Sequence, residues 1–483
     1  MSDDTMFRPP VNRAMRTLDR SLFQKTFPLA AARIANNKDI SLVRGALEKS
    51  KDVLSASRLQ SVQHDPLPEL ASQGRKCVLL RPDVKHDDPS TWSPTIVEIQ
   101  SKGTASIVPY DLHLDYDHWT YDEIMSAIVP EADQEDAYPK RFSQVGHILH
   151  LNLRESHQPY KDIIAQVLKD KSHNVETVIS KVDNVGDESE FRTFSYEVLI
   201  GHGDLNVELH EENCTFRFDY GKVYWNSRLQ GEHRRMVRAF KEGEAVCDVM
   251  AGVGPFAVPA GKKRIFTWAN DLNPESYACM VEAVGRNKVG QFVRAFNADG
   301  HAFIRDATAD LFRSSRRVTV KAAPGGSRRK AGGEKVPATV DPKSLERVLV
   351  QPRIFSHYVM NLPANAIDFL PSFIGLYARS PVSEALGTDD PSTLFAPHTG
   401  VQLPMVHVYC FGTKSDDNVE QEIDICKRIS EKLEFEITRE TLDGEIFDVR
   451  DVAPNKRMFC ASFRLPAEVA FRKPDGADDR FVD

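Results

Sequence analysis

The sequence predicts a doubly wound α/β domain with a mostly parallel sheet, beginning near residue 241. The prediction rests on short apolar runs that alternate with helical stretches. Five of these runs are expected strands: AVCDVM (245–250), RIFTWAND (264–271), FVRAFNAD (292–299), IFSHYVMNLP (354–363) and MVHVYCFG (405–412). Strands that alternate with helices form parallel sheets, and ligands bind at the carboxyl ends of such strands. We therefore look for a site where these five runs end.

The segments between and after these strands have helix and strand signals of their own. In NPESYACMVEAVGRNKV, Asn273 is suited to cap a helix and Pro274 fits its first turn. The helix after the fifth strand is expected to bury one face, made of Val419, Ile423, Cys426, Ile429 and Leu433. FEITRETL (435–442) and RMFCASFRL (457–465) are expected to be closing antiparallel strands.

Upstream of residue 241 the pattern is less regular. Strand-like runs alternate with polar helical stretches over about 76–240, which indicates α+β structure: CVLLRP (77–82), HILHLNL (147–153), CTFRFDY (214–220) and KVYWNS (222–227). We therefore expect four parts: an N-terminal module (1–115), a central α+β module (116–240), the ligand-binding domain (241–470) and an acidic tail (471–483).

Composition excludes several classes of protein. The chain has 483 residues, of which 41% are hydrophobic and 27% charged, which is typical of a globular protein with two or three domains. No apolar run is long enough for a membrane span, so we expect no membrane association. The 7 cysteines are scattered singly, without metal-binding or redox spacing. We expect no metal site and a reducing intracellular compartment.

The net charge of -8 hides an uneven distribution. Acidic residues gather in 111–136 and in the tail, whereas basic residues gather near the N-terminus and in 313–345. The last segment has few large apolar residues, and we expect a disordered basic insertion there. Two interpretations stay open for it, a tolerated loop expansion and a mobile arm for RNA. Net acidity therefore does not exclude a nucleic-acid partner.

The N-terminal segment after Met6 is basic and almost free of acids. It carries Arg8, Arg13, Arg16, Arg20 and Lys25 against Asp19 alone. That composition is similar to a mitochondrial transit peptide. An ordinary basic segment that belongs to the fold is the alternative.

Polar or glycine residues end the first four strands of the expected sheet. Gly252-Val253-Gly254 follows the first strand, and it is weak evidence alone because Gly252-x-Gly254-x-x-Ala257 also satisfies a dinucleotide fingerprint. Asp271 ends the second strand and can accept two ribose hydroxyls. Asp299-Gly300 ends the third, where a carboxylate can accept an adenine amino proton, and Asn361-Leu362-Pro363 ends the fourth. Together they indicate a class I S-adenosylmethionine methyltransferase rather than a dehydrogenase. Alone, each has a simpler interpretation: Asp271 as a helix cap, Asp299-Gly300 as a turn, and Asn361 as a turn former before Pro363.

Six segments resemble the archaeal and eukaryotic tRNA (guanine(37)-N1)-methyltransferase family, over about 20–470: FRTFSYEVLIG, VYWNSRLQGEHRR, DVMAGVGPFAVPA, ANDLNP, NADGHAF and HYVMNLP. The resemblance implies methyl transfer from S-adenosylmethionine to N1 of guanosine 37 in tRNA, the first step toward wybutosine in tRNA-Phe. It also implies a monomer, an N-terminal tRNA-recognition module, and contacts with the anticodon stem-loop and tertiary core. Cytoplasmic, nuclear and mitochondrial matrix pools are expected, through an alternative start.

The resemblance also implies roles for single residues. Glu232 matches the general base, which removes the N1 proton, and Arg192 matches the residue that stabilises charge on O6. Apart from the resemblance, Arg228 and Arg235 belong to a basic cluster with Arg234 and Arg238 close to Glu232. A solvated helix face is the simpler interpretation of this cluster, and next to a base-modifying site it is expected to bind substrate phosphates. The implied cofactor-binding residues are His233, Asp248, Gly252, Gly254, Asp271, Leu272, Asp299, Gly300 and Asn361.

Some of these residues have simpler alternatives or depart from the family pattern. Physics alone favours Glu232 as a surface glutamate, and Arg192 could pair with Glu188 or Glu190. His233 stands where relatives often have Arg. Because His gains and loses its proton near neutral pH, this departure would make cofactor affinity sensitive to pH. The Asn-Leu-Pro turn lacks the aromatic residue of exocyclic-amine methyltransferases, which favours a ring nitrogen as the target.

Two other functions are alternatives to methyl transfer. The wybutosine-pathway aminocarboxypropyl transferase has a similar fold, uses the same cofactor and acts on tRNA. A catalytically inactive tRNA-binding protein that kept the cofactor fold is the second alternative. Glu232 and Asn361-Leu362-Pro363 favour methylation over the first alternative, and the intact acids at the strand ends together with Asn361 argue against the second.

Overall fold

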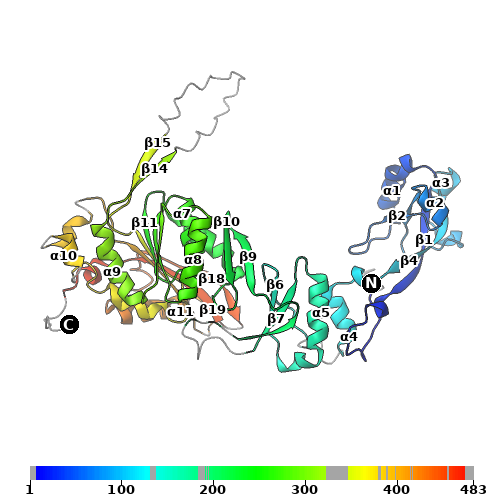
Figure 1. Ribbon diagram of the computed structural model, residues 1–483. Coiled ribbons are helices and arrows are strands. Elements are labelled where there is room, and N and C mark those ends of the chain that lie inside the picture. Colours follow the sequence, from blue (N-terminus) through cyan, green and yellow to red (C-terminus); the bar gives the residue numbers. More distant parts are fainter. Residues whose placement is uncertain are drawn as a thin grey trace, which may run out of the picture. The chain divides into compact units, whose positions relative to one another are not determined.

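The computed structural model describes residues 7–130, 137–182, 191, 193, 195–321, 346–378, 382–387, 390–396, 399–413, 415, 417–453 and 456–473. The chain divides into two compact units (Figure 1). Unit 1 comprises Met1–Lys181 with Tyr196–Gly203, and unit 2 comprises Val182–Ser195 with Asp204–Asp483. This division differs from the expected boundaries, since 116–181 folds with the N-terminal part and 204–240 with the ligand-binding domain.

Unit 1 contains two small sheets. The first is antiparallel, with order β2-β3-β1-β4, and is built from β1 (Lys25–Ile34), β2 (Val62–His64), β3 (Lys76–Leu79) and β4 (Ala105–Leu114). The second has order β5-β6-β7-β8, with only β6 and β7 parallel, and is built from β5 (Ser143–Val145), β6 (Ile148–Leu151), β7 (Thr177–Lys181) and β8 (Tyr196–Ile200). Its helices are α1 (Ile40–Lys49), α2 (Pro68–Ser72), α3 (Pro94–Ser101), α4 (Tyr121–Ile128) and α5 (Lys161–Lys171). Short 3-10 helices are η2 (Arg20–Phe23), η3 (Asn37–Asp39), η4 (Pro89–Thr91), η5 (Tyr116–His118) and η7 (Glu155–Tyr160).

The basic segment after Met6 is part of the unit 1 core. Phe7, Met15 and Phe23 are buried in a cluster that continues to Val178. The Arg13 guanidinium donates hydrogen bonds to the carbonyl oxygens of Ser126 and Val129. In the folded protein this basic segment is therefore an ordinary part of the fold, which was the alternative to a transit peptide. The same continuous core explains why 116–181 folds with the N-terminal part.

Unit 2 is built on a seven-stranded sheet of order β13-β12-β11-β16-β17-β19-β18. Its strands are β11 (Ala245–Asp248), β12 (Phe266–Asn270), β13 (Val293–Phe296), β16 (His357–Met360), β17 (Met405–Phe411), β18 (Gly444–Ala453) and β19 (Lys456–Arg464). In this sheet β19 is the one strand that runs opposite to the other six, which confirms the predicted mostly parallel α/β fold. The strand order reverses between β11 and β16, where ligands bind in such sheets.

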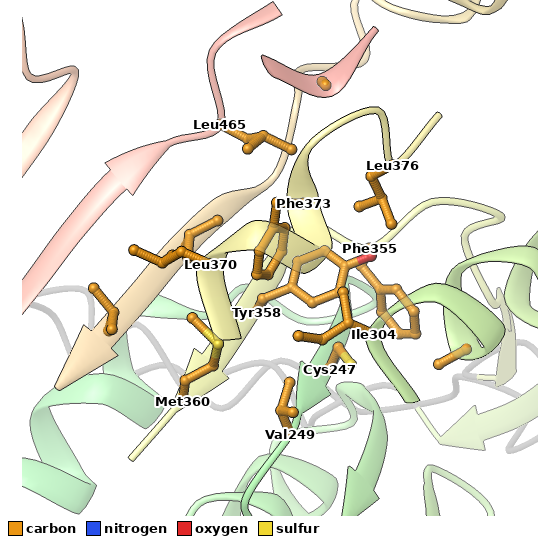
Figure 2. Close-up of a cluster of buried hydrophobic side chains, with 14 of the residues drawn as sticks. Cys247, Val249, Ile304, Phe355, Tyr358, Met360, Leu370, Phe373, Leu376 and Leu465 are labelled. Carbon is orange, nitrogen blue, oxygen red and sulfur yellow. The ribbon is translucent and has the colours of Figure 1, made fainter. Parts of the chain in front are cut away.

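Alternate residues of the central strands pack into two hydrophobic cores, one on each face of the sheet. Cys247 and Tyr358 point into the larger cluster, together with Ile304 and Phe373 (Figure 2). Their neighbours Val246 and Val359 belong to the cluster on the other face. Successive side chains of a strand point to opposite faces of the sheet, and here both faces are buried. The central parallel strands are therefore apolar along their whole length.

Helices cover the faces of the unit 2 sheet. They are α6 (Gln230–Ala239), α7 (Ala257–Lys262), α8 (Pro274–Arg286), α9 (Gly300–Arg313), α10 (Val382–Leu386), α11 (Asn418–Leu433) and α12 (Ala467–Ala470). Its 3-10 helices are η8 (Ser227–Leu229), η10 (Ala366–Phe373) and η11 (Pro391–Leu394). The predicted cap of α8 is confirmed, because the Asn273 side chain accepts a hydrogen bond from the Glu275 amide. The predicted buried face of α11 is partly wrong. Val419 and Ile423 are exposed, and α11 buries Gln421 and Ile425 along with Cys426, Ile429 and Leu433.

Two predicted strands are wrong. KVYWNS is a loop that leads into η8, and although Val223 and Trp225 are buried, no described strand pairs with it. FEITRETL forms turns, and the strand begins after it, at Gly444. A Cβ on Gly444 would lie 1.8 Å from the Ser462 carbonyl oxygen, so β18 can approach β19 here only because residue 444 is glycine.

Two hairpins complete unit 2. In the first, β9 (Asn206–Glu211) pairs with β10 (Cys214–Asp219), and the Asn287 side chain bonds both backbone groups of Thr215. That contact with the loop after α8 explains why 204–240 folds with unit 2. In the second, β14 (Arg317–Lys321) pairs with β15 (Glu346–Val350) and projects from the rest of the unit (Figure 1). Residues 313–321 of the expected disordered insertion are thus helix end and strand, whereas 322–345 lie outside the described residues, as do 474–483 of the expected tail.

Two of the expected absences can be compared with the described part of the chain. Within it, no helix is both long and apolar enough to cross a membrane. The same residues hold no group of three or more His, Cys, Asp or Glu side chains arranged for a metal ion.

Candidate active site

Helix α6 brings Glu232 and His233 to the carboxyl edge of the unit 2 sheet. The ring of Phe240, which follows α6, packs 4.9 Å from the ring of His357 at the start of β16. At the other end of the helix, Glu232 bonds Tyr409 near the end of β17. Helix α6 therefore runs antiparallel to these strands. Its first turn lies at the carboxyl ends of the strands, beside the predicted ligand residues.

The predicted glycine loop has the backbone conformation that requires glycine. Gly252 has φ 57° and Gly254 has φ 92°, both in the left-handed region. A Cβ on Gly254 would come 3.0 Å from Val258 Cγ2, whereas a Cβ on Gly252 would meet nothing within 4 Å. Gly254 thus allows the loop to pack on α7, and the open space at Gly252 lets a ligand approach the backbone.

Asp271 holds this loop in place. One of its carboxylate oxygens accepts a hydrogen bond from the Gly252 amide at 2.8 Å, and the other accepts one from the Asn273 amide at 3.0 Å. Burial raises the pKa of Asp271, and these two hydrogen bonds oppose the shift. Each oxygen keeps a further lone pair, so the carboxylate can also accept two ribose hydroxyls. Asn273, not Asp271, caps α8.

Asp248 is a buried carboxylate without a partner in the described part of the chain. Its side chain ends β11 with 0% exposure, and neither oxygen receives a hydrogen bond from the described residues. Burial raises its pKa well above the ordinary value, and the neighbouring charge of Asp271 adds to this shift. A buried unpaired carboxylate is costly, and a bound group with an N–H or O–H donor would relieve it. The donor-rich cofactor S-adenosylmethionine fits this position.

Asn270 is a site residue that the sequence analysis missed. Its side-chain amide donates to the carbonyl oxygens of Val249 at 3.1 Å and Ala298 at 2.9 Å, and its oxygen accepts from the Ala298 amide at 2.9 Å. One buried side chain thus ties together the ends of three strands. The signal in the sequence is a polar residue that ends an otherwise apolar strand directly before Asp271.

The remaining cofactor residues lie at the same edge. Asp299 caps α9, since it accepts a hydrogen bond from the Ala302 amide at 3.0 Å, whereas its simpler interpretation was a turn. A Cβ on Gly300 would come 2.7 Å from the Phe369 ring. Leu272 is 45% exposed beside Asp271, so its apolar side chain can cover a ring. Asn361 follows Met360, whose register partner is Val408, so it lies beside Tyr409.

Glu232 is buried, which contradicts its simpler interpretation as a surface glutamate. It is 5% exposed and accepts hydrogen bonds from two side chains. Arg235 donates to both carboxylate oxygens, from Nε at 2.7 Å and from Nη2 at 2.8 Å. The Tyr409 hydroxyl donates to Oε1 at 2.6 Å. Glu232 is thus a held carboxylate at the ligand edge, as a general base requires.

Arg235 has internal partners as well as an accessible side. Besides Glu232, its guanidinium contacts Glu445 Oε1 at 3.1 Å and lies 4.1 Å from the centre of the Phe447 ring. Desolvation works against its charge, but Glu232 outweighs it and raises the pKa of Arg235. Its side chain keeps 25% exposure, so a phosphate can still reach it. Tyr409, Glu445 and Phe447 were all missed by the sequence analysis.

His233 pairs with a carboxylate of β9 and packs against an aromatic ring next to the glycine loop. Its Nδ1 lies 2.5 Å from Glu211 Oε1 on β9, and its ring packs edge-on against Phe256 at 4.9 Å. Phe256 directly precedes α7, so His233 contacts the cofactor loop through an aromatic ring. Arg228 lies exposed in η8, where the Asn226 side chain accepts a hydrogen bond from its amide. Arg192 lies outside the described residues.

Comparisons with known proteins agree with this geometry. A model of the TYW2 N-terminal domain matches residues 121–204, and a model of the TRM5/TYW2 methyltransferase domain matches 208–314. The tRNA (guanine(37)-N(1))-methyltransferase of Aspergillus fumigatus is 54% identical, over 97% of this chain and 96% of its own. That of Schizosaccharomyces pombe is 42% identical, over 95% and 96%.

Two solved structures share the fold. Trm5b from Pyrococcus abyssi has a TM-score of 0.57 at 18% identity, over 90% of this chain and 99% of its own. The aTrm5 chain from its complex with tRNALeu has a TM-score of 0.55 at 17% identity, over 90% and 100%.

Proposed function

The chain belongs to the tRNA (guanine(37)-N(1))-methyltransferase family, and from that premise we propose how its residues carry out the reaction. The enzyme transfers a methyl group from S-adenosylmethionine to N1 of guanosine 37 in tRNA. The relatives named for this activity match nearly the whole chain, which favours methyl transfer over aminocarboxypropyl transfer and over a non-catalytic role. The buried and held Glu232 is the observation that carries the mechanism.

Glu232 acts on the proton of guanine N1. S-adenosylmethionine supplies an electrophilic methyl group on a sulfonium, but N1 carries a proton at neutral pH. As the bond from N1 to the methyl carbon forms and the carbon–sulfur bond breaks, the N1 proton passes to the Glu232 carboxylate. The negative charge that develops on O6 needs a donor, and we assign Arg192 to it from the family resemblance.

The cofactor residues divide into four roles. Asp271 receives the ribose hydroxyls while its Oδ2 holds the Gly252 amide. Asp248 offers its unpaired carboxylate to a donor of the cofactor. Gly252 and Gly254 let the backbone approach it closely. The residues assigned to cover the adenine and to complete the pocket at the strand ends are Leu272, Asp299, Gly300, Asn361 and, through Phe256, His233.

Arg228 and Arg235 are assigned to the phosphates of the tRNA. Both lie on the segment that carries Glu232, and Tyr224 on the same segment is 49% exposed. A cation next to an exposed aromatic ring suits a single-stranded nucleotide turned out of a loop. We assign the anticodon stem-loop to this surface, and the tertiary core to the N-terminal module. We also propose that the enzyme acts as a monomer and takes the first step toward wybutosine in tRNA-Phe.

Product analysis on defined transcripts tests this function. A tRNA transcript with guanosine 37 is expected to gain one methyl group at N1, and a transcript with adenosine 37 none. Transfer of an aminocarboxypropyl group, or methylation at another position, would contradict the proposal.

We place the protein in the cytoplasm, the nucleus and the mitochondrial matrix. The Arg-rich segment after Met6 supports an import signal that is read before folding, because Phe7 and Met15 are buried once unit 1 has folded. Replacing Arg8, Arg16 and Arg20 by Gln is expected to abolish uptake by isolated mitochondria. Unchanged uptake of that variant would remove the mitochondrial assignment.

A further inference from the structure

We propose that Tyr409 is the positioning residue of the catalytic base, and that it makes Glu232 Oε2 the oxygen that accepts the N1 proton. The inference rests on the proposed role of Glu232 and goes beyond it, because it distinguishes the two carboxylate oxygens. Tyr409 lies 177 residues from Glu232 in the chain, on β17.

The two oxygens of Glu232 differ in how many donors they receive. Oε1 accepts the Tyr409 hydroxyl at 2.6 Å and Arg235 Nη2 at 2.8 Å. Oε2 accepts Arg235 Nε at 2.7 Å. A carboxylate oxygen has about two lone-pair sites, so Oε1 is filled and Oε2 keeps one site for a proton. The proton from guanine N1 therefore goes to Oε2, and the carboxyl group formed keeps the Tyr409 bond on Oε1.

Tyr409 can act on Glu232 only as a donor. Its side chain is fully buried, and its ring packs against Phe256 of the cofactor loop at 6.1 Å. Burial raises the pKa of Tyr409 well above its ordinary value, and the neighbouring Cys460 and Glu232 add to this shift. Burial thus favours the protonated hydroxyl, which is the form that donates to Glu232. A donor that faces the ionised form of a carboxyl group favours that form, so Tyr409 also keeps Glu232 ready to act as a base.

Arg235 is the cationic partner of Glu232, and the other titratable groups around this pair are uncharged or have partners of their own. From β19, Cys460 faces the pair, and burial raises the pKa of its thiol to about 12. From β17, His407 faces Arg235, and burial lowers the pKa of His407 well below the ordinary value. From β18, Glu445 pairs with the far side of Arg235. From α6 itself, His233 is paired with Glu211. Removing the Tyr409 hydroxyl therefore removes one defined donor from Glu232 and leaves Arg235 in place.

The test is the pH dependence of single-turnover methyl transfer in Tyr409→Phe. Phe keeps the ring that packs on Phe256, so the affinities for S-adenosylmethionine and tRNA are expected to stay unchanged. Because a donor to a carboxylate favours its ionised form, loss of the Tyr409 hydroxyl is expected to move the acidic limb of the profile to higher pH. The rate at neutral pH is expected to fall by about 10-fold, the usual size for a hydrogen bond to a charged group.

A second variant is expected to shift the profile in the opposite direction. 3-Fluorotyrosine at position 409 keeps the ring and the hydroxyl but makes the hydroxyl a stronger donor, so the acidic limb is expected to move to lower pH. The matched control is Tyr358→Phe, which removes a buried hydroxyl bonded to Thr308 Oγ1 at 2.6 Å, in the cluster on the other face (Figure 2). Its profile is expected to match that of the unmodified enzyme.

Three outcomes would overturn the inference. They are an unshifted limb in both position-409 variants, an equal shift in Tyr358→Phe, or a loss of S-adenosylmethionine affinity in Tyr409→Phe. Measuring the single variant Glu232→Gln beside Tyr409→Phe separates this inference from the proposed function. If Glu232→Gln alone leaves the rate unchanged, the base assignment itself fails. If Glu232→Gln abolishes transfer but Tyr409→Phe has no effect, only the inference about Tyr409 fails.

Discussion

The two halves of the unit 2 sheet build their parts of the active site in different ways. In the cofactor half, β11 to β13, backbone loops and the residue next to each loop make the site, as Asp271 does with Gly252 and Asn273. In the base half, β16 to β19 with α6, side chains from distant segments meet, as Glu232 does with Tyr409 and, through Arg235, with Glu445. The first half is local in sequence, and the second depends on the folded sheet. We therefore expect substitutions in the cofactor half to change binding and those in the base half to change the chemical step.

The strongest expected effect in the cofactor half is at Asp271. Asp271→Ala removes the acceptor of the Gly252 and Asn273 amides together with the ribose contact. We expect the Kd for S-adenosylmethionine to rise by about 10- to 100-fold, with tRNA affinity unchanged. Calorimetry measures the first and filter binding the second. Asp310→Ala, an exposed carboxylate on α9, is the control and is expected to bind normally. Loss of tRNA affinity in Asp271→Ala would break the division between the halves.

Asp248 gives a prediction in which stability and binding move in opposite directions. Burial raises the pKa of Asp248 in the folded protein. At low pH the carboxyl is protonated in both the folded and the unfolded chain, and its burial then has no electrostatic cost. As the pH rises above the ordinary pKa of Asp, the unfolded chain loses this proton more readily than the folded one, so the folded protein is destabilised. Asp248→Asn is therefore expected to stabilise the cofactor-free protein at neutral pH by about 1–3 kcal/mol, and this gain is expected to shrink as the pH falls.

The same substitution is expected to weaken S-adenosylmethionine binding, because the amide that replaces the Asp248 carboxylate carries no charge. Melting temperatures at several pH values, with and without the cofactor, measure both effects. A destabilised cofactor-free variant would show that Asp248 has a protein partner.

Glycine at position 254 is expected to have a smaller effect. Gly254→Ala places a side chain at φ 92°, with its Cβ 3.0 Å from Val258, and is expected to cost about 1–3 kcal/mol of stability and to weaken cofactor binding. Gly285→Ala is the matched control, because this glycine lies within α8 and a Cβ there meets nothing within 4 Å. That control is expected to stabilise the protein by about 1 kcal/mol. Equal effects of the two changes would remove the conformational argument for the loop.

The smallest effect is expected at His233, which lies on α6 in the base half and packs against the cofactor loop. His233→Arg places a permanent cation next to Glu211 and the Phe256 ring. Since His233 contacts the cofactor loop only through that ring, we expect cofactor affinity to change by less than about 3-fold, which is under 1 kcal/mol. Its pH dependence is also expected to stay the same. A clear change in that dependence would show that His233 contacts the cofactor directly.

The same contrast explains how much could be predicted from sequence. The five parallel strands and the residues at their ends could be placed, because Gly252, Asp271 and Asp299 stand directly after apolar runs. Tyr409, Glu445 and Phe447 could not, because nothing local marks a buried tyrosine as the partner of a glutamate on another element. The edge strand was missed because Phe435 and Ile437 alternate like a strand, whereas the sheet pairing begins only at Gly444.

Glu232→Gln tests the central claim, that Glu232 in the base half performs the chemical step and does not itself bind the cofactor. The measurement is the single-turnover rate of methyl transfer to a tRNA transcript with guanosine 37, together with the Kd for S-adenosylmethionine on the same protein. Gln keeps the shape of the side chain but cannot accept the N1 proton, so the rate is expected to fall by about 10²- to 10⁴-fold while the Kd stays unchanged. An unchanged rate, or a rate that falls only in proportion to lost cofactor affinity, would contradict the claim.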